Sequence, residues 1–437
     1  MSVVAYPAYK DSGVRWIGRV PASWNVLPFK RLARLCTERA EGRTFPVALE
    51  NIEGWSGRRI ETDATYEGEG IAFNSGDILF GKLRPYLAKA WVADRCGEAV
   101  GDFHVIRSFG GHRAEYLQRV LLTQEVISLI DGSTYGAKMP RASWDFMGML
   151  PVPVPPADEQ TAIATFLDRE TGKIDTLVAE QERLIALLKE KRQAVISQAV
   201  TKGLNPDVPM KPSGVEWLGD IPKHWQIKPL KRVTSFVSGG TPSKEREDYW
   251  AGDIPWVSPK DMKTWIVSGH SDGITMEAVA SARLVMIQEN AVLVVVRGMI
   301  LAHSFPVAVA GRPLTINQDM KALLTPSAQA ARFLAYALSA TTERVFEFID
   351  EAGHGTRALR MEGFANMKLA FPNIEEQTQI VEFIECETAR LDKLITEAAR
   401  AVILLKERRA ALISAAVTGK IDVRNLVQPS AEQAFAA

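Results

Sequence analysis

The side chains of this sequence that could do chemistry are basic and hydroxyl groups in or beside glycine-rich loops. Arg and Lys can donate hydrogen bonds to guanine O6 and N7, whereas Ser, Thr and backbone amides can hold phosphates. Neighbouring glycines let the backbone approach a ligand closely. Each residue by itself could equally be a solvated surface group, so the prediction depends on their grouping. The candidate nucleic-acid contacts are Lys82, Arg84, Tyr86, Thr134, Tyr135, Lys138, Arg141, Thr241, Ser243, Lys244, Lys260, Lys263, His354, Thr356, Arg357 and Arg360.

The overall charge limits what these loops can do alone. The 437 residues contain 52 Lys and Arg against 52 Asp and Glu, so the net charge is zero. A neutral chain has no long-range field that would steer a polyanion towards it. Any nucleic-acid face must therefore be a local patch, or partner chains must neutralise most of the phosphates.

We find no catalytic or cofactor-binding motif beside these loops. The sequence lacks a G-x-x-x-x-G-K-[ST] phosphate loop, a G-x-G-x-x-G after a strand and a G-x-S-x-G elbow. The six histidines do not fall at metal-ligand spacing with Cys or carboxylates. Asp253, Asp261 and Lys263 form a loose acid–acid–lysine set, which keeps a nuclease as a weak alternative. We expect no catalytic residue, metal or cofactor in this chain.

Cysteine usage and hydropathy indicate a cytoplasmic protein. The three cysteines are far apart and odd in number, so a disulfide framework is not expected. No signal peptide is visible at the start of the sequence. The most apolar run, residues 291–311, is interrupted by Arg297, His303 and Pro306, which favours two buried strands over a membrane span.

The segments that are expected to position these loops occur twice in the sequence. Residues 187–201 and 404–418 are identical at 11 of 15 positions, and the stretches 12–32 and 213–233 at 10 of 21. Each half therefore reads as a short entry motif, a variable region and a long helix. Such duplication predicts a circular order of segments that is opened at one point, so that the two chain termini lie near each other.

The repeated helices carry apolar residues every three to four positions, as in helix-on-helix packing. A helix of about 44 residues is about 65 Å long, more than a compact lobe needs. We therefore expect two antiparallel helices that act as rigid struts; the alternative is one independent core helix in each of two domains. The predicted seam residues are Ile174, Leu177, Leu184, Leu188, Val195, Leu391, Leu394, Leu405 and Leu412.

The variable regions predict mixed α/β lobes. Strand-rich runs occupy 76–93 and 290–300, and amphipathic helices are expected at 114–131 and 331–350. The predicted fold class is α+β: two globular lobes of mixed α/β separated by two long antiparallel helices, pseudo-two-fold and circularly organised.

Three stretches together resemble one known family. They are "SGVEWLGDIPKHWQIKPLKRV", "FPNIEEQTQIVEFIECETARLDKLITEAARAVILLKERRAALISAAVTGKID" and "SGGTPSKEREDYWAGDIPWVSPKDMK", the first two of which occur in both halves. Over residues 10–425 the chain is similar to the specificity subunits of type I DNA restriction–modification systems. The resemblance implies target-recognition domains at 1–155 and 204–372, conserved helices at 156–203 and 373–420, and a tail at 421–437.

The resemblance also implies a function. Each recognition domain would read one half of a bipartite, asymmetric site in double-stranded DNA. The helices would set the spacer and dock two modification subunits, which bind S-adenosylmethionine and methylate adenine N6. Two restriction subunits, which bind ATP and Mg, would add ATP-driven translocation and cleavage, and this chain would be non-catalytic. The rival interpretation is a two-lobed coiled-coil scaffold that binds protein or glycan, or, less readily, a nuclease.

Overall fold

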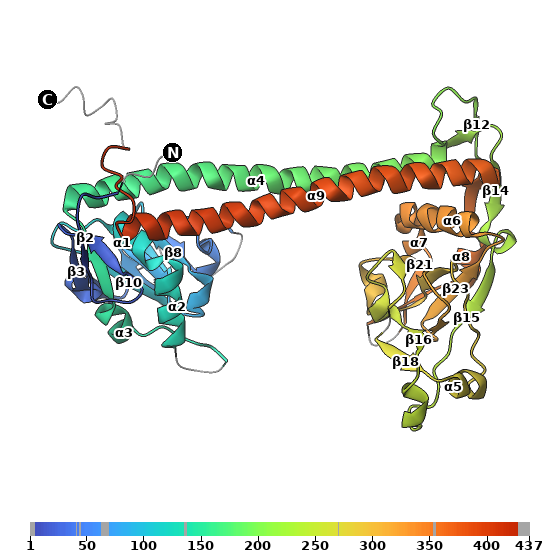
Figure 1. Ribbon diagram of the computed structural model, residues 1–437, viewed down its shortest axis with the longest axis horizontal. Coiled ribbons are helices and arrows are strands. Elements are labelled where there is room, and N and C mark those ends of the chain that lie inside the picture. Colours follow the sequence, from blue (N-terminus) through green and yellow to red (C-terminus); the bar gives the residue numbers. More distant parts are fainter. Residues whose placement is uncertain are drawn as a thin grey trace. The chain divides into compact units, whose positions relative to one another are not determined.

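Two long helices organise the chain (Figure 1). The computed structural model describes residues 5–426, apart from 41, 43–44, 63–69, 135–137, 270 and 353–354. Helix α4 spans Ala157–Lys202 and helix α9 spans Ile374–Val417. Both begin with two acidic residues in the first turn, where the positive end of the helix dipole favours negative charge.

The chain forms two units, and each unit takes part of both long helices. Unit 1 comprises residues 1–182 and 399–437, and unit 2 comprises residues 183–398. The sequence suggested lobes and helices in succession, whereas here the division falls within both helices. The lobe boundaries predicted above remain predictions.

The first and last described segments meet in unit 1. The Tyr9 hydroxyl donates to the Gly419 carbonyl over 3.1 Å, and the Arg424 guanidinium lies 4.9 Å from the centre of the Tyr6 ring. The Tyr6 hydroxyl donates in turn to Glu159 in the first turn of α4. These contacts confirm that the chain closes on itself.

The two entry motifs fold alike. Each is a hairpin followed by a strand that pairs with the strand leading into a long helix. The indole of Trp24 in unit 1 and that of Trp225 in unit 2 are fully buried. Trp24 packs in a core with the end of α9, and Trp225 in a core with the end of α4. The strands are β1 (Tyr9–Asp11), β2 (Arg19–Pro21), β3 (Asn25–Pro28) and β11 (Pro151–Val154) in unit 1, and β12 (Met210–Pro212), β13 (Asp220–Pro222), β14 (Gln226–Pro229) and β26 (Lys368–Phe371) in unit 2.

The main sheets of the two lobes share one plan. Their strand orders are β4-β10-β7-β8 in unit 1 and β15-β23-β19-β21-β17 in unit 2. The first four strands of each sheet pair antiparallel, and β17 adds a parallel edge in unit 2. The strands are β4 (Ala33–Cys36), β7 (Ile78–Gly81), β8 (Ala90–Val92) and β10 (Phe103–Ser108), and β15 (Ser235–Ser238), β17 (Ile266–Val267), β19 (Val292–Val295), β21 (Val307–Ala310) and β23 (Met320–Leu324).

Smaller sheets distinguish the lobes. Unit 1 has β5-β9-β6, whereas unit 2 has β18-β16-β22 and β20-β25-β24. Their strands are β5 (Pro46–Val47), β6 (Gly70–Phe73), β9 (Gly97–Val100), β16 (Ile254–Val257), β18 (Asp272–Ile274), β20 (Arg297–Gly298), β22 (Thr315–Ile316), β24 (Ile349–Ala352) and β25 (Thr356–Leu359).

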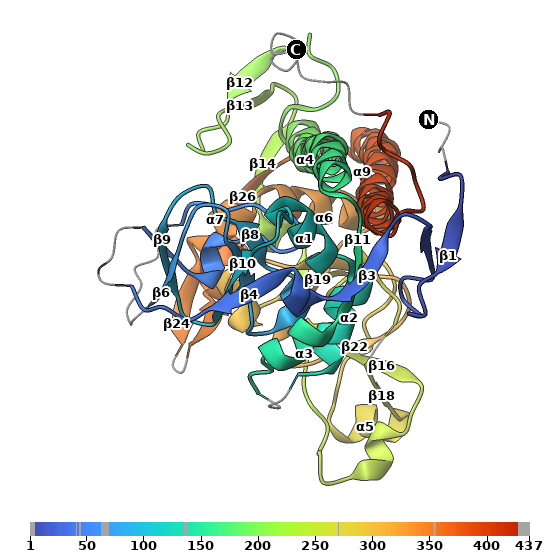
Figure 2. The ribbon, with the colours of Figure 1, turned by 90° about the vertical axis from the view of Figure 1, so that its left-hand side faces the viewer.

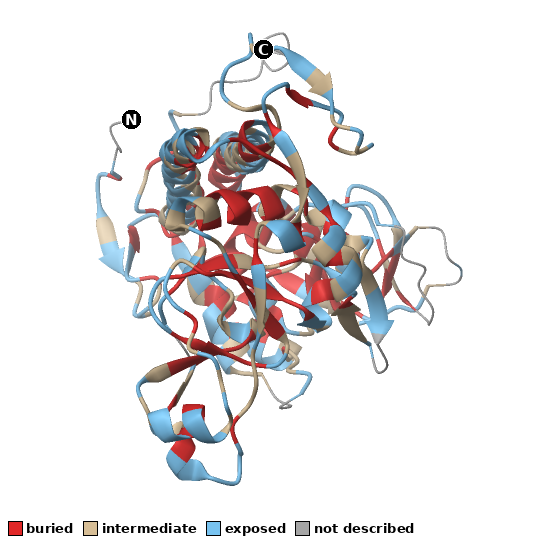
Figure 3. Cartoon of the chain, turned by 90° about the vertical axis from the view of Figure 1, so that its right-hand side faces the viewer, coloured by how far each residue is buried: buried red, intermediate tan, exposed pale blue. Residues whose placement is uncertain are grey.

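Short helices cover the main sheets. In unit 1, α1 packs beside β8 (Figure 2). In unit 2, buried residues gather on α6 and on the strands beneath it (Figure 3). Each predicted amphipathic helix is broken in two, and in unit 1 the break is Thr123, whose hydroxyl accepts from Val126 N as the N-cap of α2. The helices are α1 (Ala114–Leu121), α2 (Gln124–Gly132), α3 (Trp144–Met149), α5 (Met276–Ser281), α6 (Ala328–Ala340), α7 (Thr342–Phe346) and α8 (Met361–Asn366).

An ion pair at an equivalent place attaches each lobe to a long helix. In unit 1, Arg119 of α1 pairs with Asp168 of α4. In unit 2, Arg332 of α6 pairs with Glu385 of α9, with 2.8 Å between Nη1 and Oε1. Asp168 and Glu385 occupy the same position of the repeated helix, so the attachment is duplicated along with the helix.

In each unit, α4 and α9 pack antiparallel. Asp175 pairs with Arg409 and Glu182 with Lys406 in unit 1, so the residue numbers rise on one helix as they fall on the other. In unit 2, Arg192 pairs with Asp392. The buried and half-buried positions recur at alternating steps of four and three residues, which is the spacing of a coiled-coil seam. The seam is Ile174, Val178, Gln181, Ile185, Leu188, Arg192 and Val195 on α4, and Leu391, Ile395, Ala398, Val402, Leu405, Arg409 and Leu412 on α9.

Six of the nine predicted seam residues lie on this stripe, and the prediction is wrong for the other three. Leu177, Leu184 and Leu394 are 45%, 42% and 42% exposed. Each immediately precedes a seam position and is therefore turned about 100° away from it. Spacing alone could not separate the seam from a leucine stripe along its flank.

No helix in the described part of the chain is both long enough and apolar enough to cross a membrane.

Candidate nucleic-acid interface

Two of the predicted contact loops meet in unit 1. Backbone Arg84 N donates to Pro140 O, and Ala142 N donates to Lys82 O, both over 2.8 Å. The segment after β7 and the segment before α3 therefore lie side by side, although more than fifty residues separate them in the sequence. The structure thus brings the candidates Lys82, Arg84 and Tyr86 together with Lys138 and Arg141.

One aspartate, Asp102, forms ion pairs with two of these cations. Asp102 accepts from Arg141 Nε at 3.0 Å and from Arg141 Nη2 at 3.1 Å, and Lys82 Nζ lies 3.7 Å from its Oδ1. The hydrogen bond from Arg141 holds the pKa of the Asp102 carboxyl below its usual value. Arg141 and Lys82 therefore brace the loop, whereas the side chains of Arg84 and Lys138 are exposed.

A buried histidine that the sequence reasoning missed supports the same loop. The ring Nε2 of His104 lies 3.0 Å from Ala142 O. Burial lowers the pKa of His104, so the neutral ring donates to this carbonyl. The signal for this role was absent from the sequence, because a lone His carries no spacing that reports its partner.

Thr134 and Tyr135 are the remaining candidates of this loop. Tyr135, like His354 in unit 2, lies outside the described residues. The Thr134 hydroxyl donates to Asp131 O over 2.8 Å and so closes the end of α2. Thr134 therefore has a local structural role.

Unit 2 repeats the arrangement at the same place in its sheet. Leu359 N donates to Val296 O over 2.9 Å, as Ala142 N does to Lys82 O in unit 1. β20 pairs with β25, which places Arg297 opposite Ala358 and brings it beside Thr356 and Arg357. Arg297 is exposed and was not among the predicted contacts. Leu83 occupies the equivalent place after β7, so comparison of the two halves gives no signal for a cation at Arg297.

Arg360 has a supporting role near this point. Its Nη2 donates to Glu347 O over 2.7 Å, and its Nε lies 3.1 Å from Asp350 Oδ2. The side chain therefore fastens the start of α8 to the segment around β24.

The remaining predicted contacts surround a different sheet of unit 2, β18-β16-β22. Lys260 Nζ lies 2.6 Å from Asp272 Oδ2, and the Thr241 hydroxyl donates to Gln318. A hollow lined by Lys244, Lys260, Trp250 and Trp256, among others, opens here. The Ser243 carbonyl accepts a hydrogen bond from Trp250 Nε1 over 3.0 Å. The side chain of Lys263 is exposed. The candidates of unit 2 thus form two groups on two sheets.

The acid–acid–lysine set has a local explanation. Both oxygens of Asp261 accept hydrogen bonds from the backbone and side chains of Ser258 and Ser271, at 2.6–2.9 Å. Burial would raise the pKa of Asp261, but these bonds outweigh it and the pKa is lowered. Asp261 thereby closes the turn after β16. Within the described ranges, no three His, Cys, Asp or Glu side chains are grouped so that they could hold a metal ion.

Exposed leucines on the long helices form an equivalent pair in each unit. In unit 1 they are Leu177 and Leu404, and in unit 2 Leu394 and Leu187. The repeat relates Leu177 to Leu394 and Leu187 to Leu404. All four immediately precede a seam position, which in an antiparallel pair puts both members on one side.

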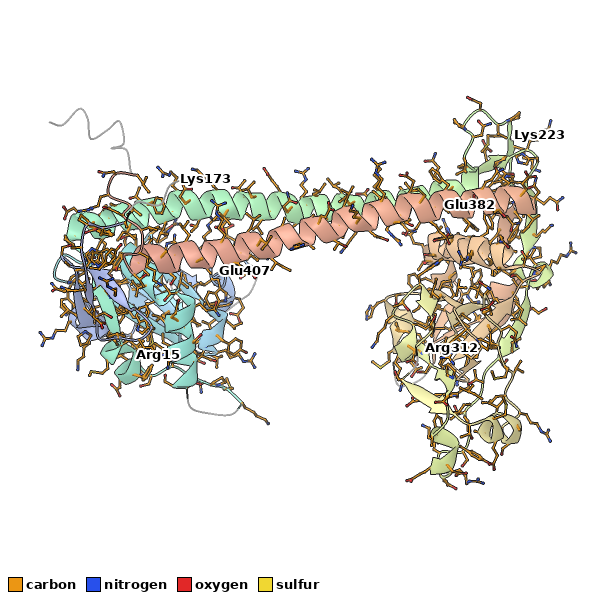
Figure 4. The ribbon with its side chains drawn as sticks, viewed as in Figure 1. Arg15, Lys173, Lys223, Arg312, Glu382 and Glu407 are labelled. Atoms are coloured by element: carbon orange, nitrogen blue, oxygen red, sulfur yellow. The ribbon has the colours of Figure 1, made fainter. Side chains whose placement is uncertain are left out.

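Figure 4 indicates which side of unit 1 this is. Lys173, one helical turn before Leu177, points away from the sheet of unit 1. The leucine pair of this unit therefore faces away from the lobe.

Comparison with known sequences identifies relatives. Residues 222–400 match the family described as type I restriction modification DNA specificity domain. The specificity subunit of the Escherichia coli type I restriction enzyme EcoR124I/EcoR124II is 29% identical over 262 residues, which covers 60% of each protein. The MjaIX specificity subunit of Methanocaldococcus jannaschii is 29% identical over 168 residues, covering 37% of this chain and 38% of that one. The matches thus span less than two thirds of each relative's length.

Solved structures share the fold. A chain from work described as the structural basis underlying complex assembly and conformational transition of the type I R-M system superposes with a TM-score of 0.73 at 16% identity, covering 91% of this chain and 98% of that one. The HsdS subunit from Thermoanaerobacter tengcongensis gives 0.53 at 16% identity, covering 92% and 98%. These likenesses confirm the predicted fold class.

Proposed function

We propose that this chain, which belongs to the family of type I restriction–modification specificity subunits, is the DNA sequence-recognition subunit of such a system. The observation that carries the proposal is the duplicated plan. Two lobes with the same sheet order are attached through equivalent ion pairs to equivalent positions of a repeated helix. Such a molecule is suited to reading two separate sites of similar geometry and different sequence.

Each lobe would read one half of a bipartite, asymmetric site in double-stranded DNA. In support, each lobe has exposed cations where a central strand ends beside the loop before its last short helix: Arg84 and Lys138 in unit 1, and Arg297, near the half-buried Arg357, in unit 2. Cations of this kind position a duplex through its phosphates or read guanine in the major groove. The lobes differ in their side chains at these points, so their half-sites would differ too.

The long helices would set the spacer and carry the partners. Because a paired-helix strut is stiff, its length would fix the number of unread base pairs between the half-sites. The two equivalent pairs of exposed leucines support two docking places for two copies of one chain, the modification subunit. Two restriction subunits would join that assembly.

Chemistry would then belong to the partners. We infer that S-adenosylmethionine is bound by the modification subunits, which methylate adenine N6, and that ATP and Mg are bound by the restriction subunits. The local hydrogen bonds of Asp261 support a structural role for the one acidic set considered as a nuclease. A complex of this kind would act on DNA in the cytoplasm.

The test is the methylation pattern that the chain dictates. The full chain would be produced together with the modification subunit of its own system in a host that lacks adenine methylation, and the genome sequenced for N6-methyladenine. We expect one asymmetric motif with two specified parts and a gap of fixed length. The matched control is the modification subunit alone, which should give no motif. A protein- or glycan-binding scaffold would leave the genome unmodified and would not shift duplex DNA in a gel.

A further inference from the structure

We propose that each lobe contacts base edges of DNA through an apolar tip: Tyr86 with Leu87 in unit 1 and Met299 with Ile300 in unit 2. The inference depends on the proposed function and deepens it, because it names side chains that choose bases. The tips are defined by their place in the fold, and only Tyr86 is suggested by sequence pattern.

Both tips lie on a single 3-10 turn directly after the strand end described above. In unit 1 this turn is η3 (Pro85–Leu87), and in unit 2 it is η7 (Met299–Ala302). The residue before each turn has a positive φ, 51° at Arg84 and 143° at Gly298. The chain therefore changes direction sharply at the same point in both lobes.

The turns are anchored underneath and apolar on top. Pro85 in unit 1 and Leu301 in unit 2 are buried. By contrast, Tyr86 is 47% exposed and Met299 is 73% exposed, the highest value for a large apolar side chain among the residues that the structure describes. Packing within the lobe does not explain exposed apolar side chains on the same turn in two lobes of different sequence. Exposed apolar groups on an anchored turn are typical of an interaction site.

The charges around the tips favour nucleic acid as the partner. Arg84 and Lys138 flank the tip of unit 1, and Arg297 flanks that of unit 2. The nearby acid Asp102 is already paired with Lys82 and Arg141. Cations beside an apolar centre complement a groove, since phosphates line its rims and the thymine 5-methyl group projects from its floor.

Arg357 adds to the charge in unit 2, although Glu351 lies opposite it across the β24–β25 ladder. The tip of unit 2 is the more apolar of the two, because Met299 and Ile300 lack a hydroxyl group such as that of Tyr86. We expect Met299 to discriminate bases chiefly by contact with methyl groups and Tyr86 by its ring.

The experiment compares base preferences at the two half-sites. The full chain and its modification subunit are selected on duplexes with each half-site randomised in turn, as wild type, Met299→Ala and Tyr86→Ala. Loss of one apolar contact should reduce discrimination about three- to tenfold at one or two base pairs. Met299→Ala should affect one half-site only, and Tyr86→Ala the other. At an affected thymine, replacement by uracil should weaken wild-type binding but leave binding of the Ala variant unchanged.

The matched control is Met276→Ala, which removes another exposed methionine of unit 2, on α5, and should alter no preference. Unchanged preferences in Met299→Ala and Tyr86→Ala would overturn the inference. So would an equal loss of binding to all sequences, because it would make the tips backbone contacts, or a change in both half-sites from one substitution. A wild-type complex with no base preference would instead refute the proposed function itself.

Discussion

Arg409 of α9 donates from Nε to Asp175 Oδ1 of α4 over 2.8 Å, and from Nη1 to the Trp55 carbonyl over 2.8 Å. The repeat places Arg192 and Asp392 at the equivalent positions in unit 2, where Nε and Oδ1 lie 3.0 Å apart. The Arg409 side chain is 11% exposed and that of Arg192 is 34% exposed. The pair is thus duplicated, but among the residues that the structure describes a lobe loop bonds to it in unit 1 alone.

This difference predicts that replacing the arginine by alanine lowers the free energy of unfolding more in unit 1 than in unit 2. Arg409→Ala leaves Asp175 with the exposed Arg58 as its partner. It also removes the donor to the buried side of Asp175 and to the Trp55 carbonyl, so we expect the free energy of unfolding of unit 1 to fall by about 2–4 kcal/mol. Arg192→Ala removes a more exposed pair and should cost less than about 1 kcal/mol. Urea denaturation of both variants against wild type measures this, and equal costs would show that the loop cover is irrelevant.

Lowering the pH should weaken the support that the buried His104 gives to the segment before α3 in unit 1. Burial lowers the pKa of this ring in the folded chain, whereas the unfolded chain takes up a proton near pH 6.5. The contribution to stability is therefore fully present above about pH 6.5 and is lost as the pH falls from there towards the lower folded pKa.

The check is the slope of the free energy of unfolding between pH 7.5 and 5.5, compared in wild type and His104→Gln. The variant should show a shallower slope, because glutamine does not titrate. His112, whose pKa burial also lowers, keeps its share in both chains. Parallel slopes would contradict this prediction.

The leucine pairs predict the stoichiometry of the complex. Leu404→Asp places a charge on the docking face of unit 1 only, so one modification subunit should be lost while the other stays bound. Leu187→Asp should do the same in unit 2, and the double variant should bind none. Mass photometry of the mixture gives the count. Ile403→Asp, an equally exposed neighbour on the other flank of α9, is the control and should leave two subunits bound.

The spacer prediction needs an insertion in both helices. Because each long helix passes through both units, extra residues in α4 alone would break the seam. Seven residues added between 182 and 183 and again between 398 and 399 keep the heptad and lengthen both helices by about 10 Å. Methylome sequencing should then show a gap about three base pairs longer with unchanged half-site bases. Altered half-site bases with an unchanged gap would refute the proposal that the long helices set the spacer length.

Much of the fold could be predicted because the repeat supplies information that a single helix pattern lacks. The antiparallel pairing and the closure of the chain follow from the repeat, and the strands at 76–93 and 290–300 follow from runs rich in β-forming residues. Leu177 was misassigned because a stripe of leucines flanks the true seam. The seam itself includes polar residues such as Gln181 and Arg192, which apolar periodicity does not detect.

The site was harder to predict, since its geometry depends on contacts between distant segments. Lys82 and Arg141 were chosen as contacts, yet Asp102 engages both. Arg297 and Met299 were missed, because their exposure results from one turn after a buried strand and nothing in their spacing signals it. Loop chemistry indicates where to look, and the pairing of strands decides which side chains are available.

The closure of the chain at Tyr9 and Gly419 has a consequence for biosynthesis. Unit 2 is one uninterrupted stretch, residues 183–398, and we expect it to become resistant to protease while the ribosome is still at work. Unit 1 needs Ile413, Ala416 and Val417 for its core, so residues 1–182 cannot complete that core until the end of α9 has been synthesised. Chains stopped after residue 398 should therefore yield a stable second half and a digestible first half. Residues 1–182, although synthesised before unit 2, would complete their fold after it.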